Sequence, residues 1–272
     1  MDEWRVIEDI PRDGTANMAI DRAILAACES SEVLPTLRLY SWERPTLTVG
    51  YAQNIDREID FEKCLEQGIQ VVRRPTGGRA LLHHHEVTYS FTAPIPHPKF
   101  PPSLYGVYKV ISQALIEGLV EVGVKDAVLA SSKKAKKDYL SFHSPSCLSS
   151  INHWEIEVRG AKLVGSAQRR TKNAFLQQGS ILIDCDRKLL NSLFKYKANG
   201  SRLRSMNNLN NKFITLSECL EKDVSCEEVS KALRKGFSRT LFGRWIRGSL
   251  SSSELVRCAD YVDSKEIPTI LS

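Results

Sequence analysis

Two adjacent glycines stand among cationic side chains in the first third of the chain. Gly77 and Gly78 follow Arg74 and precede Arg79. Glycine has no Cβ, so the backbone can approach a ligand closely here, and its amides can donate to a carbonyl or phosphate oxygen. The segment predicts a site for an anionic or carbonyl-bearing ligand, although an ordinary tight turn has the same signature.

Three consecutive histidines, His83 to His85, follow the glycine turn. Neighbouring side chains on a strand point to opposite faces, so these three rings cannot all bind one metal ion without a break in the strand. We therefore expect no metal site, and we place only His83 among the candidate substrate-binding residues.

The chain has seven cysteines, an odd number, with no C-x-x-C spacing. This pattern argues against a disulfide framework and against a zinc site, so free thiols are expected. Cys147 alone is flanked by small polar residues, within the stretch 144–150. A cysteine thiolate is a strong nucleophile, which makes Cys147 the candidate for covalent catalysis.

The composition is that of an ordinary soluble protein of 272 residues, with 42% hydrophobic and 26% charged residues. The acidic N-terminus does not resemble a signal peptide and no long apolar run is present, so we expect a cytoplasmic protein without a membrane partner. The net charge is +6, and part of it lies at 133–137 in a run of four lysines. That run is most often a solvated loop, but it could also dock an acidic protein. No nucleic-acid-binding motif accompanies it, and no nucleic-acid partner is expected.

The glycine turn must be held by secondary structure on both sides. Alternating apolar residues predict strands at 69–72 and 87–91 beside the turn, and helical spacing predicts helices at 17–29, 56–67 and 104–122. The same alternation predicts further strands at 4–9 (an edge strand), 36–42 and 46–51 (a hairpin), 124–129, 154–159, 162–168 and 174–184.

The last third of the chain reads as mainly helical. Capping boxes at Ser225 and Ser251, each with glutamate three residues later, predict helices at about 226–241 and 254–262. Residues 130–150 and 197–211 are expected to be loops. The pattern as a whole predicts an α+β fold with mixed or antiparallel sheets flanked by helices.

Two stretches together resemble the biotin/lipoate protein ligase superfamily. The first is Arg-Arg-Pro-Thr-Gly-Gly-Arg-Ala from Arg73, running on to Thr88-Tyr-Ser; the second is Gly-Ala-Lys-Leu-Val-Gly-Ser-Ala-Gln-Arg from Gly160, followed by Gln178-Gly-Ser. The resemblance covers roughly 4–240. It implies a ligase-like catalytic domain over 1–245 and a helical C-terminal extension over 246–272 that packs on it.

Within this superfamily the sequence is most similar to the LipM-type octanoyltransferases. The turn reads Gly-Gly-Arg where lipoate ligases usually have a third glycine, and Cys147 stands fifteen residues before Lys162. The resemblance implies transfer of an octanoyl group from acyl carrier protein to a lysine of a GcvH-like lipoyl-domain protein in lipoate biosynthesis, without a cofactor.

The resemblance also implies roles for individual residues. Cys147 would carry the acyl thioester and Lys162 would acidify that thiol. The remaining candidates would line the acyl slot or supply amides to the thioester carbonyl: Arg74, Gly77, Gly78, Arg79, His83, Ser166 and Ala167. The chain departs from the pattern at Leu148-Ser149-Ser150, where the family commonly has aromatic and acidic residues.

Two other functions stay open on the sequence alone. In an ATP-dependent lipoate or octanoate ligase, Lys162 would bind the acyl-adenylate and Cys147 would be incidental. In a binding module without activity, the lysine-rich run would hold a partner, although the presence of both Cys147 and Lys162 disfavours this. From the residues alone, Lys162 could equally be an exposed hairpin lysine.

Overall fold

The computed structural model describes residues 1–130, 155–195, 212–263 and 269–271. The strands are β1 (Glu3–Glu8), β2 (Thr36–Tyr40), β3 (Thr46–Val49), β4 (Gln70–Arg73), β5 (Leu81–His83), β6 (Glu86–Pro94), β7 (Val128–Leu129), β8 (Ile156–Val158), β9 (Ala161–Arg170), β10 (Ala174–Leu182), β11 (Arg244–Arg247) and β12 (Thr269–Leu271). The helices are α1 (Gly14–Glu29), α2 (Ile55–Glu58), α3 (Phe61–Glu66), α4 (Leu104–Val122), α6 (Arg187–Ser192), α8 (Leu216–Leu220), α9 (Cys226–Thr240) and α10 (Ser252–Asp263).

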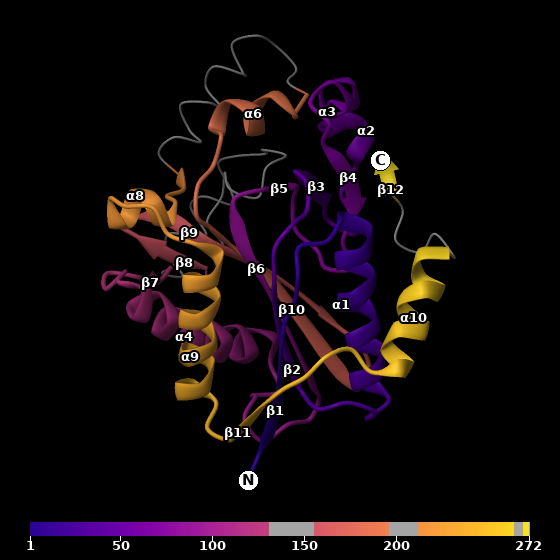
Figure 1. Cartoon of the computed structure of the whole chain (residues 1–272), viewed down its shortest axis with the longest axis vertical. Coiled ribbons are helices and arrows are strands. Elements are labelled where there is room, and N and C mark those ends of the chain that lie inside the picture. Colours follow the sequence, from indigo (N-terminus) through magenta and orange to yellow (C-terminus); the bar gives the residue numbers. More distant parts are fainter. Residues whose placement is uncertain (131–154, 196–211, 264–268, 272) are drawn as a thin grey trace.

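These strands form two sheets (Figure 1). The large sheet has eight strands in the order β11-β1-β2-β6-β10-β9-β8-β7, and the small sheet has four in the order β12-β4-β3-β5. Helices α4 and α9 pack together on one face of the large sheet, and α1 and α10 lie on the other (Figure 1). The expected α+β fold with mixed sheets flanked by helices is confirmed.

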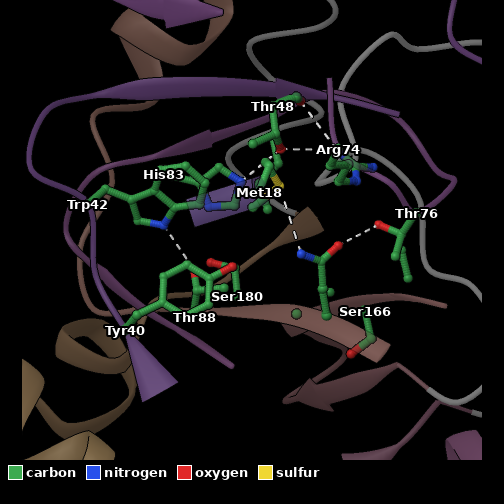
Figure 2. Close-up of a pocket in the computed structure, with 15 residues that line it drawn as sticks. Met18, Tyr40, Trp42, Thr48, Arg74, Thr76, His83, Thr88, Ser166 and Ser180 are labelled. Carbon is green, nitrogen blue, oxygen red and sulfur yellow. Dashed lines mark hydrogen bonds between the residues drawn. The ribbon is translucent and has the colours of Figure 1, made fainter. Parts of the chain in front are cut away.

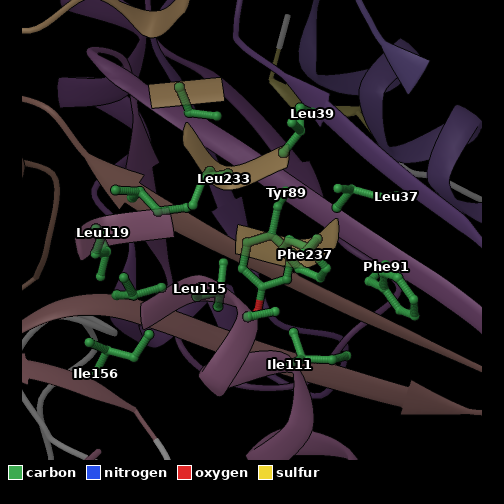
Figure 3. Packing of buried hydrophobic residues seen from close by; sticks show 14 of the residues in the cluster. Leu37, Leu39, Tyr89, Phe91, Ile111, Leu115, Leu119, Ile156, Leu233 and Phe237 are labelled. Atoms are coloured by element: carbon green, nitrogen blue, oxygen red, sulfur yellow. The ribbon is translucent and has the colours of Figure 1, made fainter. Parts of the chain in front are cut away.

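The main hydrophobic core lies between the large sheet and the α4/α9 pair. Phe91 of β6 and Phe237 of α9 are fully buried and stacked, with ring centroids 5.5 Å apart (Figure 3). The two helices cross closely because Gly236 faces Gly118, where a Cβ on Gly236 would lie 2.3 Å from the Gly118 nitrogen. Burying each such phenylalanine stabilises the fold by about 1.5–3 kcal/mol, which fixes the sheet that carries the pocket described below.

Most predicted elements are present, and the helices beginning after Ser103 and Ser225 have those residues as N-caps. Three expectations were wrong. Residues 36–42 and 46–51 do not form a hairpin, because β2 joins the large sheet and β3 the small one. The helix expected at 56–67 is broken into α2 and α3, since Asp60 caps a new helix by accepting from the Lys63 amide. Strand β1 is not an edge strand, because β11 pairs with it in parallel.

The C-terminal segment is anchored to the rest of the molecule by strands and by an ion pair. Strand β12 pairs with β4, and α10 packs on α1. Arg5 Nη1 of β1 donates to Glu254 Oε2 of α10 at 2.8 Å, with both side chains buried. Beyond residue 245 the chain thus adds strand as well as helix. The division into a domain over 1–245 and an extension over 246–272 stays a prediction. None of the helices in the described part of the chain is long and apolar enough to cross a membrane.

Candidate active site

A pocket of about 390 Å³ lies where the large sheet, the small sheet and α1 meet (Figure 2). Its walls come from both stretches that the sequence singles out, and none of the described residues that line it is acidic. The lining residues are Met18, Tyr40, Trp42, Thr48, Arg74, Thr76, Leu81, His83, Thr88, Gly165, Ser166, Ala167, Gln178, Gly179 and Ser180. Four predicted site residues, Arg74, His83, Ser166 and Ala167, are therefore brought together in one pocket.

One wall of the pocket is a chain of hydrogen bonds that runs through His83. Arg74 Nη1 donates to Thr48 Oγ1 at 3.1 Å, and Thr48 Oγ1 lies 2.8 Å from His83 Nε2 (Figure 2). On the other side of the ring, His83 Nδ1 lies 2.7 Å from Glu86 Oε1. Because a carboxylate oxygen only accepts, Nδ1 carries the hydrogen of that bond and Nε2 faces Thr48.

The Glu86 carboxylate fixes the hydrogen-bonded wall that contains His83. This fully buried group also accepts from the hydroxyl groups of Thr88 and Ser180. Trp42 packs flat against His83, with ring centroids 4.1 Å apart, and its Nε1 donates to Thr88 Oγ1 at 2.8 Å. The imidazole is therefore fixed in position and in orientation by buried partners.

The opposite end of the pocket is organised by Asp21 of α1. Gln178 Nε2 donates to Asp21 Oδ2 at 2.5 Å, while Thr76 Oγ1 donates to Gln178 Oε1 at 3.0 Å. Arg38 and Tyr40 each donate to the Asp21 carboxylate at 2.8 Å. Burial, together with the charge of Asp21, raises the pKa of Tyr40 well above its usual value, so its hydroxyl keeps the proton that it donates.

The packing of the pocket wall formed by β9 and β10 requires a glycine at position 179. Tyr89 Oη lies 2.7 Å from Ser166 Oγ and accepts from Gln177 Nε2 at 3.0 Å. A Cβ on Gly179 would lie 2.4 Å from the Tyr89 ring and 2.8 Å from Ser166 Oγ. Burial raises the pKa of Tyr89 to about 12, so its hydroxyl stays protonated at neutral pH.

The predicted glycine turn lies beside the pocket rather than in its lining. Arg74 Nη2 donates to the carbonyl oxygens of Gly77 at 2.7 Å and Arg79 at 2.8 Å, which clamps the turn. Gly78 has a positive φ of 92°. Gly50 packs against this turn, and a Cβ on Gly50 would lie 1.9 Å from the Gly78 oxygen. That the turn supplies amides to an acyl carbonyl stays a prediction.

Lys162 is completely buried, so the alternative of an exposed hairpin lysine is wrong. Its Nζ donates to Glu155 Oε1 at 2.6 Å. It stands at the start of β9, the strand whose residues Gly165 to Ala167 line the pocket, but it is not itself a lining residue. Cys147, its predicted catalytic partner, lies outside the described residues.

Sequence reasoning missed the acidic residues that hold the pocket together. Asp21 stands on the apolar side of the predicted helix at 17–29, where a charged residue is out of place unless it is paired. A charged residue on the apolar side of a helix is therefore the signal by which the sequence could have identified Asp21. Glu86 gave no comparable signal, because it stands in sequence next to the polar residues His84 and His85.

The chain matches known proteins over most of its length. Residues 13–238 match the model of the lipoyl protein ligase A/B catalytic domain. The octanoyltransferase LipM of Geobacillus kaustophilus is 40% identical over 240 residues, which cover 88% of this chain and 86% of that protein. The octanoyltransferase LipM of Kyrpidia tusciae is 37% identical over 254 residues, which cover 93% of each chain.

Solved structures share the fold at lower sequence identity. A bipartite lipoate protein ligase from Thermoplasma acidophilum superposes with a TM-score of 0.77 at 20% identity, covering 97% of this chain and 93% of that one. A lipoate-protein ligase A bound with ATP gives a TM-score of 0.76 at 22% identity, covering 96% and 94%. The domain match and the relatives together show that this chain belongs to the lipoyl protein ligase A/B catalytic-domain family.

Proposed function

We propose that this protein is an octanoyltransferase that moves an octanoyl group from acyl carrier protein to a lysine of a GcvH-like lipoyl-domain protein. The reaction would proceed through a thioester on Cys147 and would serve lipoate biosynthesis in the cytoplasm. The observation that carries the proposal is the arrangement of β9, which places buried Lys162 four residues before Ser166 in the pocket wall. The relatives that bear the name octanoyltransferase LipM support the same reaction.

The pocket suits the acyl part of such a substrate. Met18, Trp42 and Leu81 supply apolar surface, and the part of the lining that the structure describes has no acidic side chain. Burial of an unbranched alkyl chain against such surface contributes about 0.8 kcal/mol for each methylene. Arg74 and Thr76 add polar groups that would orient a carbonyl.

The chemistry divides into two exchanges at one sulfur atom. In the first, the Cys147 thiolate attacks the carbonyl carbon of the donor thioester, and the carrier leaves as its thiolate and takes up a proton. In the second, the amine of the acceptor lysine attacks the enzyme thioester, an amide forms, and the Cys147 thiolate is released. The amine loses one proton in this step, so each exchange is balanced without a nucleotide.

Lys162 would favour the thiolate form of Cys147 through its charge. A nearby ammonium stabilises an anion most strongly where water is excluded, and Lys162 is fully buried. The Glu155 carboxylate at 2.6 Å would hold that ammonium in place. Lys162 is thus proposed to act on the nucleophile and not on an adenylate phosphate.

A transfer assay separates this function from an ATP-dependent ligase. The protein is mixed with a lipoyl domain and either octanoyl-carrier protein without nucleotide, or free octanoate with ATP and magnesium. We expect modification of the acceptor lysine from the first mixture. A product that forms only from the second mixture would overturn the proposal in favour of a ligase.

A further inference from the structure

One side of the pocket in the candidate active site, called the acyl pocket below, is a row of residues that crosses the large sheet. Gly165 of β9 lies opposite Ser180 of β10, and Ser180 lies opposite Thr88 of β6. Thr88 in turn lies opposite Tyr40 of β2. All four residues line the pocket, and three of them are labelled in Figure 2. The pocket therefore runs across the strands and not along them.

The proposed function places the two ends of the octanoyl chain along this row. Lys162, which is proposed to activate Cys147, stands on β9 three residues before Gly165, so the thioester belongs at the β9 end. Thr88 lies two strands away, roughly 10 Å across the sheet. An extended octanoyl chain covers that distance. The far half of the chain therefore meets Ser180 and Thr88.

Each hydroxyl group of the row commits its single hydrogen to a buried carboxylate. Thr88 Oγ1 and Ser180 Oγ both donate to Glu86. Tyr40 Oη donates to Asp21 Oδ2 at 2.8 Å. Both carboxylates are fully buried, and a carboxylate only accepts, so the direction of each bond is fixed. Toward a ligand, these hydroxyl oxygens can accept a hydrogen bond but cannot donate one.

Glu86 also takes up the other polar hydrogens at this end of the pocket. His83 Nδ1 lies 2.7 Å from Glu86 Oε1, which leaves His83 Nε2 to accept from Thr48 Oγ1 at 2.8 Å. Trp42 Nε1 donates to Thr88 Oγ1 at 2.8 Å and lies 3.2 Å from Glu86 Oε1. Glu86 itself does not line the pocket. These described side chains thus present a ligand with apolar atoms and acceptors, and none of them presents a donor.

We infer that Glu86 makes the protein select an unsubstituted alkyl chain, by occupying the donors that would otherwise bind an oxygen atom on the far half of the acyl group. The inference rests on the proposed function and specifies its class of acyl donor. Glu86 acts through Thr88 and Ser180, so it is a positioning residue.

The chemistry of the substituent decides how strongly a chain is rejected. An oxo group can only accept, so on entering the pocket it would lose its hydrogen bonds to water and find no donor to replace them. A hydroxyl group in the same place can still donate to Thr88 Oγ1 or Ser180 Oγ. The pocket should therefore reject an oxo chain more strongly than a hydroxy chain, and both more strongly than octanoyl.

A set of small donors tests the inference on the full-length protein. Acylation of Cys147 is measured with octanoyl-pantetheine and with analogues that carry an oxo or a hydroxyl group at carbon 6 or 7, far enough from the thioester to leave its reactivity unchanged. We expect kcat/KM for the oxo donors to be about ten- to a hundredfold below that for octanoyl, with the hydroxy donors between them. Equal rejection of oxo and hydroxy donors would mean that the pocket selects by polarity alone, and the inference would be wrong.

Glu86→Gln tests the residue itself. Glutamine keeps the size but has one acceptor oxygen and an NH₂ group, so at least one of the Thr88 and Ser180 hydroxyls must turn its hydrogen toward the pocket. The ratio of octanoyl to oxo donor should fall about tenfold, and it should return when Thr88→Val and Ser180→Ala are added. An unchanged ratio in folded Glu86→Gln would overturn the assignment.

Ser180→Ala alone tests the same point with Glu86 intact. The parent ratio should remain, because the Ser180 hydrogen is not available to the ligand. A further loss with the oxo donor alone would show that Ser180 binds the substituent, which contradicts the inference. Glu254→Gln is the matched control, since Glu254 is also fully buried but pairs with Arg5 and does not line the pocket. It should lower stability and keep the parent ratio.

Binding of free octanoate and 7-oxooctanoate, measured by calorimetry, separates the inference from the proposed function because it needs no acyl transfer. If octanoate binds about ten- to a hundredfold more tightly while no donor acylates Cys147, the proposed function fails and the selectivity of the pocket stands. If all donors acylate Cys147 at equal rates and both acids bind equally, the proposed function stands and the inference is overturned.

Discussion

Lys162 Nζ donates to Glu155 Oε1 at 2.6 Å, and both side chains are buried. Removal of one partner from a buried ion pair leaves an uncompensated charge and typically costs about 3–5 kcal/mol, whereas apolar replacement of both is often neutral. We predict that Glu155→Gln and Lys162→Met each lower the free energy of unfolding in urea by about that amount. The double variant Lys162→Met/Glu155→Leu should recover most of the loss.

The double variant also separates stability from activity at this pair. It should fold almost as stably as the parent and yet transfer octanoyl groups slowly, because the ammonium that is proposed to activate Cys147 is gone. Parent-like transfer by this stable variant would show that Lys162 has only a structural role.

Gly50 and Gly77 lie close together in the molecule but should respond differently to alanine. A Cβ on Gly50 would lie 1.9 Å from the Gly78 oxygen, so the glycine turn would have to move. We predict a loss of about 1–3 kcal/mol of unfolding free energy for Gly50→Ala, measured by thermal or urea unfolding. A Cβ on Gly77 would meet no atom within 4 Å, so Gly77→Ala should fold like the parent.

Because Gly77→Ala should not change stability, any change in the KM for the acyl donor would report on how closely the donor approaches this backbone. If the donor passes close to this backbone, the variant should keep its stability and raise the KM for the acyl donor. An unchanged KM would mean that no part of the donor contacts the turn at Gly77, and the predicted role of that glycine would be withdrawn.

Full or partial removal from water lowers the reactivity of the cysteines that the structure describes. It raises the pKa of Cys28, Cys64 and Cys185 to about 12 and that of Cys219 to about 11, and it also raises the pKa of Cys226 and Cys258. A raised pKa keeps a thiol protonated at pH 7, and thiolate forms only as the pH approaches the raised value. Iodoacetamide at pH 7 should therefore label Cys147 first, as peptide mass spectrometry can check.

The same labelling experiment tests the role of Lys162. In Lys162→Ala, loss of the positive charge disfavours the thiolate, so labelling of Cys147 at pH 7 should slow and recover at higher pH. Exposed Cys226 serves as the internal reference. If its rate and that of Cys147 keep the same ratio in both proteins, Lys162 does not activate the thiol.

The local pattern of the sequence predicted the elements but not how distant elements meet. The alternation at 36–42 and 46–51 marks two strands correctly, yet it carries no information on sheet membership, and β2 and β3 belong to different sheets. Arg74, His83, Ser166 and Ala167 could be named from two stretches. The buried partners that fix the pocket could not, because Asp21 and Gln178 are 157 residues apart in sequence. Burial of Lys162 likewise depends on packing that no local pattern records.

The lysine-rich run at 133–137 lies outside the described residues, and its role stays a prediction from charge alone. We expect it to attract acidic carrier protein at long range, which acts on the rate of encounter. Neutralising its four lysines should raise the KM for octanoyl-carrier protein and flatten its salt dependence, with little effect on octanoyl-pantetheine. An unaltered KM at low salt would dispose of this role.

The central claim is that Cys147 carries the octanoyl group between donor and acceptor. The most direct measurement is the intact mass of the protein after it is mixed with octanoyl-carrier protein in the absence of nucleotide. We predict one octanoyl adduct on Cys147 that hydroxylamine removes, that is absent in Cys147→Ser, and that passes to a lipoyl domain when the isolated adduct is mixed with it. An unmodified mass, together with transfer that strictly requires ATP, would contradict the account.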